Sequence, residues 1–261
     1  NLKQAANLDQ NGMKTFLTDI ENGSIFKEYG ILNFIEADFF DWYLDSWDEE
    51  LFKAWKLFIS TLANYSLLTL DVDPDTTRDL LKKLYEQLMP RELRHNLGEY
   101  YTPDWLAQHV LNLLENGRYS GNPKKRILDP ACGSGTFLVL AIKRMQKYCA
   151  ENNISKQNTL YYILNAVVGF DLNPLAVITA RTNYLLALGD LLKYKNSDIN
   201  VPVYLCDSIL TPHEVEDILT QNAIRFNTSV GPFIIPKSLI EANYIDLFAL
   251  FLEEAVRLNL N

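Results

Sequence analysis

Residues 126–137 read Arg-Ile-Leu-Asp-Pro-Ala-Cys-Gly-Ser-Gly-Thr-Phe and carry the clearest signal of the fold. A short apolar run ends in Asp129, a turn of small residues follows, and an apolar-periodic segment runs from Thr136 to about Ala150. This order of strand, glycine-rich turn and helix is typical of sites that hold a nucleotide-like ligand at a helix N-terminus. Gly133 and Gly135 can adopt positive φ and let a ligand approach the backbone closely, because they have no Cβ.

The alternation of strand and helix continues after this turn. Residues 166–171 and 201–205 are predicted strands, and Asn173-Pro174 is predicted to begin the helix between them. Strands that alternate with helices favour a parallel, doubly wound sheet. The sequence therefore predicts an α/β fold.

Residues 1–96 are predicted to form a helical N-terminal region. Ser46 and Glu49 have the spacing of a capping box before an apolar run with helical periodicity. Asp73-Pro74 is predicted to begin a later helix, which Pro90 ends. We therefore expect two parts, divided between residues 96 and 97.

Shorter signals predict the remaining elements. Thr102-Pro103 is predicted to begin a helix that Gly117 closes. Asn158 is predicted to cap a short helix, and residues 244–258 have the pattern of an amphipathic helix. Residues 224–230 are expected to form an edge strand or an extended loop, because nearby prolines disfavour central strands.

Composition limits the functions open to the chain. The net charge is −9, from 24 Lys+Arg and 33 Asp+Glu, whereas a protein that binds nucleic acid by itself usually has a basic face. We expect no membrane span, because no stretch of about 18 residues is free of charge and strongly apolar. Three scattered cysteines indicate a reducing, cytoplasmic setting, and neither they nor the histidines have the spacing of a metal site.

Three acids lie at or near the predicted carboxyl ends of strands, where open α/β sheets bind ligands: Asp129, Asp171 and Asp207. At neutral pH each carboxylate only accepts hydrogen bonds. One acid can receive an ammonium, a second can hold two ribose hydroxyls, and a third can accept from an exocyclic amine. A ligand that needs all three is an amino acid joined to an adenosine, which describes S-adenosylmethionine. Asp129 disfavours a dinucleotide, because it would repel the pyrophosphate.

Four motifs in order resemble those of DNA adenine-N6 methyltransferases. Asp129–Phe137 is similar to their cofactor-binding signature, and Gly98–Pro103 to the segment that precedes it. Gly169–Pro174 and Leu205–Leu210 are similar to the motifs of the second and third strands. The resemblance covers residues 97–210. The helical region before them also resembles the N-terminal region of large restriction–modification methyltransferases, from bacteria or archaea.

This resemblance implies a Rossmann-like, S-adenosylmethionine-dependent methyltransferase sheet, incomplete in this chain, within residues 97–261. Thr102, with Tyr101, would line the methionine carboxylate, and Asp129 would receive the methionine ammonium. The turn would give the cofactor access to its backbone. The turn residues implied at the cofactor are Ala131, Gly133, Gly135 and Phe137.

The adenosine end of the cofactor is assigned by the same resemblance. Asp171 would hold the ribose hydroxyls, Leu172 would pack on the adenine ring, and Asp207 would accept from the adenine amine. Cys132 lies inside the turn, and we expect it to be a small buried filler without a nucleophilic role.

One motif of the family is missing. The chemistry requires Asn/Asp-Pro-Pro-aromatic, whose polar groups accept from the target amine and whose ring stacks on the flipped base. The 261 residues contain no Pro-Pro pair. We therefore expect the chain to stop before this motif and to bind the cofactor without catalysing methyl transfer. Most DNA contacts would then lie in other parts of the protein. We also expect the chain to self-associate through an exposed sheet edge. The alternatives are a methyltransferase acting on RNA, protein or a small molecule, and a non-catalytic scaffolding module with the same fold.

Overall fold

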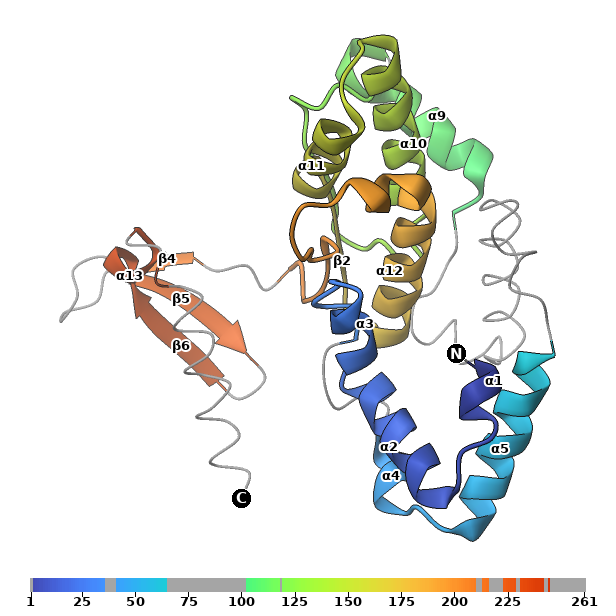
Figure 1. Ribbon diagram of the computed structural model, residues 1–261. Coiled ribbons are helices and arrows are strands. Elements are labelled where there is room, and N and C mark those ends of the chain that lie inside the picture. Colours follow the sequence, from blue (N-terminus) through green and yellow to red (C-terminus); the bar gives the residue numbers. More distant parts are fainter. Residues whose placement is uncertain are drawn as a thin grey trace. The chain divides into compact units, whose positions relative to one another are not determined.

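The computed structural model describes residues 2–35, 41–64, 102–117, 119–209, 213–215, 223–228, 231–241 and 244. The chain divides into two compact units, Asn1–Cys206 and Asp207–Asn261 (Figure 1). The boundary expected at residues 96–97 lies outside the described residues, and so do the helix expected after Asp73-Pro74 and nearly all of the one expected at 244–258.

Short helices form the beginning of the first unit. They pack around a small apolar cluster that includes Met13, Leu17, Tyr43 and Ile59. The Tyr43 hydroxyl donates to Glu21 Oε1 at 2.7 Å, which joins two of these helices at the edge of the cluster. The helices are α1 (Leu2–Ala5), α2 (Gln10–Glu21), α3 (Ser24–Glu28), α4 (Trp42–Asp45) and α5 (Glu49–Ala63).

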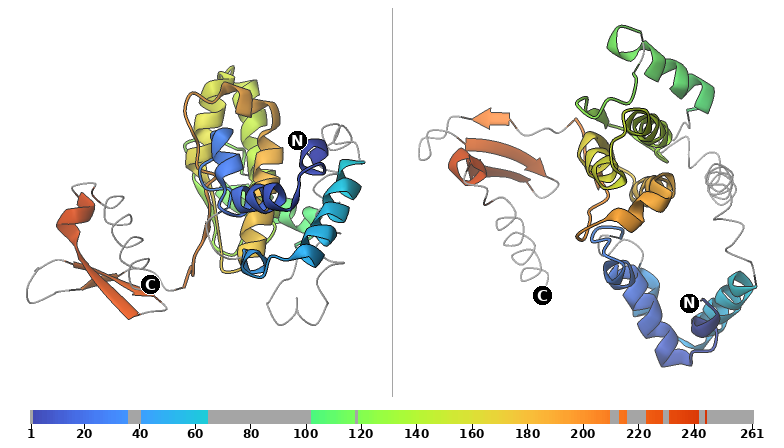
Figure 2. Two further views of the ribbon diagram at one scale, coloured as in Figure 1. Left: turned by 60° about the horizontal axis from the view of Figure 1, so that its bottom comes forward. Right: turned by 45° about the horizontal axis from the view of Figure 1, so that its top comes forward.

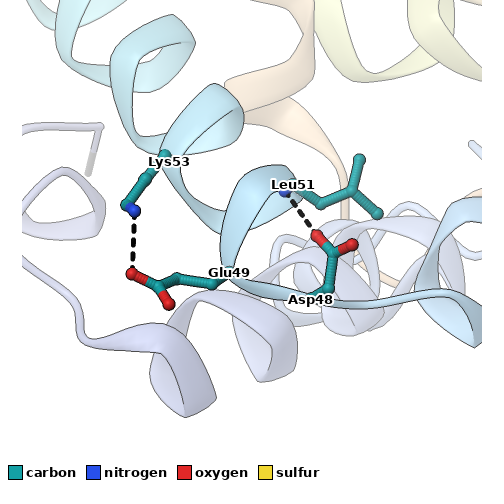
Figure 3. A network of polar contacts seen from close by, with 4 residues as sticks. All are labelled: Asp48, Glu49, Leu51 and Lys53. Carbon is teal, nitrogen blue, oxygen red and sulfur yellow. Dashed lines mark hydrogen bonds and ion pairs between the residues drawn. The ribbon is translucent and has the colours of Figure 1, made fainter.

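The start of α5 corrects one sequence prediction. Asp48 has an extended backbone and its Oδ1 accepts from the Leu51 N–H at 2.8 Å, so Asp48 is the N-cap (Figure 3). Ser46 instead closes α4, and the capping box predicted from Ser46 is wrong. A carboxylate directly before the first turn both accepts a free N–H and complements the helix dipole. Glu49 follows in the helix and pairs with Lys53 at 2.8 Å.

A parallel sheet forms the rest of the first unit, which confirms the predicted α/β fold. Among the described residues its order is β1-β2-β3, with Asp129 level with Gly169 and Asp171 level with Leu205. Figure 2 shows α10, α11 and α12 gathered together in both views. The elements are α9 (Asp104–Gly117), β1 (Ile127–Asp129), α10 (Thr136–Glu151), α11 (Lys156–Ala166), β2 (Val167–Asp171), α12 (Pro174–Leu188), the 3-10 helix η1 (Gly189–Tyr194) and β3 (Val203–Leu205).

The two faces of the sheet differ in burial. Val167 and Val203 are fully buried against the helices, and a Cβ at Gly169 would lie 2.6 Å from Leu138 of α10. Because side chains alternate along a strand, Leu128 and Tyr204 point to the opposite face. They are 53% and 40% exposed, although parallel sheets are normally covered on both faces. Among the described residues, this face of the sheet is therefore the more exposed of the two.

Two helices of this unit test the predicted caps. Asn173 Oδ1 accepts from the Leu175 N–H at 3.0 Å, so the predicted start of α12 is confirmed. The cap predicted at Asn158 is wrong, because Ser155 caps α11 and its Oγ accepts from the Asn158 N–H at 3.2 Å.

The stretch Pro174–Tyr194, which contains α12, is long and apolar enough to cross a membrane by length and composition alone. Its residues Ala180 and Tyr184 are fully buried in the protein core. A helix that is apolar all round suits such a buried position, so we assign this stretch to the core.

The N-terminal part is tied to the segment before β3. Ile31 and Ile199 form a parallel bridge. The Asn33 side chain pairs with both backbone groups of Val201, at 2.9 Å to its carbonyl and 2.7 Å from its N–H. Asn33 thus replaces a neighbouring strand at this point, and residues 30–34 complete the edge of the α/β core.

The second unit contains a small antiparallel sheet of order β4-β5-β6 among the described residues. Its elements are β4 (His213–Val215), β5 (Ala223–Thr228), β6 (Gly231–Pro236) and α13 (Lys237–Glu241). The expected edge strand or loop at residues 224–230 is instead the central strand β5. Pro232 and Pro236 lie on β6, at the edge of the sheet, where a missing N–H is tolerated.

Candidate functional site

Two acidic side chains lie at the carboxyl edge of the parallel sheet. Asp129 and Asp171 are the last residues of β1 and β2. Asp207 follows β3 by two residues in the sequence and is the first residue of the second unit. The Cys206 N–H donates to the Asp171 carbonyl at 3.0 Å, which extends the pairing of β2 with β3 by one residue. Since the three strands are parallel, their carboxyl ends share one edge of the sheet. This edge is where ligands of α/β sheets bind.

Asp171 connects the second strand to the glycine-rich turn. Its Oδ2 accepts from the Gly133 N–H at 2.8 Å, and its Oδ1 accepts from the Asn173 N–H at 2.9 Å. Each carboxylate oxygen has a second lone pair that can accept from a ligand. Asp171 therefore holds the turn in place and can still bind hydroxyl groups.

Asp129 lies in a less favourable environment for its charge. Burial raises the pKa of this carboxyl, the nearby charge of Asp171 raises it further, and the Ala131 N–H opposes both effects. That N–H donates to Asp129 Oδ1 at a long 3.3 Å. A ligand cation placed here would offset the burial and the repulsion, because it favours the charged form of the carboxyl.

The turn itself leaves space for a ligand. Gly133 and Gly135 have φ of +54° and +84°, a region that favours glycine. Among the described residues, a Cβ on Gly133 would meet no atom within 4 Å, whereas one on Gly135 would lie 3.3 Å from the Cβ of Ala180. The turn is thus packed on the side of Gly135 and open on the side of Gly133.

Cys132 is a buried thiol within this turn. Its N–H donates to the Phe170 carbonyl at 2.8 Å, which fixes the start of the turn against β2. Burial, followed by the charges of Asp129 and Asp171, raises the pKa of the thiol. A thiol that stays protonated is a poor nucleophile, in agreement with a role as filler.

The other predicted site residues belong to several separate segments of the chain. Leu172 is 67% exposed at the end of β2, and Phe137 packs partly against the core. Asp207 Oδ1 accepts from the Ile209 N–H at 2.8 Å. Ala131 is exposed, and Thr102 is half-buried and makes no hydrogen bond to the described part of the turn. Tyr101 lies outside the described residues.

Sequence reasoning did not identify two buried polar residues behind this site. Asn183 Nδ2 donates to the Ser134 carbonyl at 2.8 Å, and Arg181 Nε donates to the Val203 carbonyl at 2.9 Å. Both side chains are at most 2% exposed. The sequence shows polar residues on a largely apolar helix, but not which of them are buried or which distant carbonyls they bond.

Within the described residues, no group of three or more acidic, histidine or cysteine side chains has the geometry to hold a metal ion.

Comparison with known proteins assigns the chain to a family. Residues 76–240 match the family model described as N-6 DNA Methylase. The adenine-specific methyltransferase PglX of Streptomyces coelicolor is 32% identical over 111 residues, which cover 41% of this chain and 9% of that protein. The type I restriction enzyme MjaVII methylase subunit of Methanocaldococcus jannaschii is 26% identical over 208 residues, covering 71% and 32%.

A solved structure, of the DrdV–DNA complex by cryo-electron microscopy, is similar with a TM-score of 0.42 and 20% identity, covering 61% of this chain and 15% of that one. The chain spans less than a third of the length of the two methylase relatives. Since the family model matches more than half of the residues, the chain belongs to the N-6 DNA methylase family.

Proposed function

We propose that the chain is the S-adenosylmethionine-binding part of a DNA adenine-N6 methyltransferase that acts in a restriction–modification or phage-defence system. The observation that carries this proposal is the meeting of two strand-end carboxylates with a glycine turn that is open at Gly133. Family membership and the names of the relatives support adenine methylation by the whole protein. The cytoplasm is the compartment in which such a protein would meet DNA.

The site fits the groups of this cofactor. When bound, S-adenosylmethionine supplies an activated methyl group on its sulfonium. The buried carboxylate of Asp129 would receive the ammonium, and the free lone pairs of Asp171 would accept from the ribose hydroxyls. The exposed side chain of Leu172 would cover one face of the adenine, and Asp207 would accept from its amine.

The turn and the helix that precedes β1 would complete the methionine end of the site. Gly133 and Gly135 would give backbone access, with Ala131 and Phe137 on either side of them. Tyr101 and Thr102, before α9, would line the methionine carboxylate.

We further propose that these 261 residues do not transfer the methyl group by themselves. They contain no Pro-Pro pair, and hence no Asn/Asp-Pro-Pro-aromatic motif to hold the target base. The net charge of −9 agrees with DNA contacts that lie mostly in other parts of the protein.

A titration identifies the ligand and separates the competing functions. S-adenosylmethionine should bind the purified chain in a one-to-one complex by calorimetry, and NAD should not bind under the same conditions. A preference for NAD would contradict the assignment of the acids. Binding of neither ligand would favour a scaffolding module with the same fold.

The proposal that the chain is inactive has its own test. Incubation with DNA and cofactor carrying a labelled methyl group should leave the DNA unlabelled. Robust labelling of adenine would show that the catalytic groups are already present. Transfer to RNA, protein or a small molecule, but not to DNA, would favour the alternative substrate classes.

The open face of the sheet supports a proposal of self-association. Leu128 on β1 and Tyr204 on β3 expose apolar surface that water solvates poorly, and β1 lies at an edge of the described sheet. Light scattering should show a mass that rises with protein concentration, and Leu128→Lys should reduce this rise. A constant monomer mass at high concentration would contradict it.

A further inference from the structure

A buried side-chain amide lies directly behind the glycine-rich turn. Asn183, on α12, is 2% exposed, and its Nδ2 donates to the Ser134 carbonyl oxygen at 2.8 Å. In the part of the chain that the structure describes, its Oδ1 has no hydrogen-bond partner. The reverse orientation of the amide would set two acceptor oxygens against each other, so Nδ2 is the atom that faces the carbonyl.

The position of Ser134 explains why its carbonyl needs this donor. Ser134 is 5% exposed and lies between two glycines with positive φ, Gly133 and Gly135. The Val139 N–H of α10 donates to the Gly135 carbonyl, one residue further along. The Ser134 carbonyl thus precedes the hydrogen-bonded part of α10, and a buried carbonyl without a donor is unfavourable.

The same helix also packs against the turn. Ala180 and Asn183 are three residues apart, so they share one face of α12. The Cβ of Ala180 lies 3.3 Å from the place that a Cβ on Gly135 would take. Asp171, three residues before the start of α12, accepts from the Gly133 N–H. The turn is therefore held by Asp171 ahead of the helix and by Ala180 and Asn183 in its middle.

We propose that Asn183 is a positioning residue for the cofactor. By holding the Ser134 peptide it keeps Gly133 in the conformation that leaves open space for the ligand. Asn183 is itself buried and acts through the turn, without touching the cofactor. This inference rests on the proposed function and deepens it, because it adds a residue outside the strand-end motifs.

The chain offers a matched control for this bond. Gln146 Nε2 of α10 donates to the Ala187 carbonyl of α12 at 2.9 Å, which is the same kind of contact between the same two regions. Gln146 lies ten residues beyond the start of α10 and away from the turn. Asn183→Leu and Gln146→Met each remove one such bond and nearly preserve volume.

Three measurements on the 261-residue variants test the proposal. Both variants should unfold at a lower temperature than the wild type. By calorimetry, Asn183→Leu should weaken S-adenosylmethionine binding by at least about tenfold, and Gln146→Met by no more than about twofold. In the ligand-free proteins, amide hydrogen exchange at residues 133–136 should be faster in Asn183→Leu than in Gln146→Met.

Each result decides one of the two proposals. Equal affinities and equal exchange in the two variants would overturn the positioning role of Asn183. If the wild type does not bind S-adenosylmethionine, the proposed function fails, and hydrogen exchange alone still decides whether Asn183 holds the turn.

A second variant serves if Asn183→Leu does not fold. Asn183→Asp keeps the shape of the side chain but sets a carboxylate against the Ser134 carbonyl. Its negative charge alone would attract the cationic cofactor. Weaker binding at neutral pH therefore supports the positioning role, and unchanged or tighter binding overturns it.

Discussion

The Asp129 carboxylate lies where the free protein offers its charge little compensation. It is partly buried, its one N–H contact is long, and Asp171 repels it. For folding this arrangement is unfavourable, whereas for an ammonium ligand it is attractive, because a cation relieves the burial and the repulsion together. The charge of Asp129 therefore lowers the stability of the free protein and favours binding of a cationic ligand.

Replacement of Asp129 should change stability and cofactor affinity in opposite directions. Asp129→Asn keeps the shape and an acceptor for the Ala131 N–H but removes the charge. At neutral pH we expect a higher free energy of unfolding than in the wild type, measured with denaturant. We also expect S-adenosylmethionine binding to weaken by about 10- to 100-fold, the range of one charge-assisted hydrogen bond. A variant that is less stable and binds equally well would contradict both expectations.

The pH dependence follows from the same residue. The pKa of Asp129 in the folded protein is raised above the value of about 3.9 of an unfolded chain, so its destabilising charge is present at neutral pH. As the pH falls through the folded pKa, this destabilisation disappears, whereas cofactor affinity decreases because a protonated carboxyl cannot pair with an ammonium. Calorimetry should show this decrease in the wild type and a smaller one in Asp129→Asn. Identical pH profiles would count against Asp129 as the ammonium partner.

At this scale the sequence predicted part of the candidate site. Asp129, Asp171 and the two glycines of the turn were predictable, since each belongs to a short motif at the end of a strand. Asn183 was not, because its partner is a backbone carbonyl 49 residues away, which no local pattern encodes.

Among the elements, the loop before β1 is locked against α10. Gly121 has φ of +85°, and a Cβ there would overlap the carbonyl oxygen of Arg144. The Arg144 side chain donates in turn to the Tyr119 carbonyl at 3.0 Å and to the Gln108 carbonyl of α9 at 3.2 Å. The backbone and side chain of one residue thus hold both the loop and α9 on α10.

Gly121→Ala should disrupt the packing of this loop against α10. A rigid backbone atom blocks the new Cβ and the φ is unfavourable, so we expect the free energy of unfolding to fall by about 3 kcal/mol. Gly30→Ala is the control, since Gly30 has φ of +70° but its Cβ would meet the ends of the Lys195 and Asp198 side chains, which can move aside. It should cost about 1 kcal/mol in denaturant unfolding. Equal losses would show that the overlap with Arg144 is relieved at no cost.

The sequence predicted whole elements better than their ends. The helices α10 and α12 were predictable from apolar periodicity and from the Asn173-Pro174 start. The cap of α11 was not, because Ser155 and Asn158 are both good N-caps and lie one turn apart. The central place of β5 also could not be predicted, because it depends on which strands pair with it.

At the scale of the molecule, the N-terminal helices and the α/β core are joined by the bonds of residues 30–34. Asn33 is 8% exposed and satisfies both backbone groups of Val201, while Arg181 reaches the Phe34 carbonyl at 3.3 Å. These contacts join residues more than 140 positions apart. The sequence predicted a helical N-terminal region but could not show that part of it completes the core.

Asn33→Leu should therefore destabilise more than its local region. It leaves two buried backbone groups of Val201 without partners, and we expect the free energy of unfolding to fall by about 3 kcal/mol. Limited proteolysis should then cut near residues 30–34 faster than in the wild type. Asn7→Leu is the control, because Asn7 makes one exposed bond within its own segment and should change stability little. Equal stability of both variants would show that this junction contributes nothing.

Binding of S-adenosylmethionine by the strand-end acids can be decided by one titration. Calorimetry compares the wild type with Asp171→Asn and with Asp190→Asn, a fully exposed acid that pairs with Lys193 on η1. We expect one-to-one binding by the wild type and by Asp190→Asn, and an affinity about 10- to 100-fold weaker in Asp171→Asn. Equal affinities in all three proteins, or no binding by the wild type, would contradict the assignment of these acids to the cofactor.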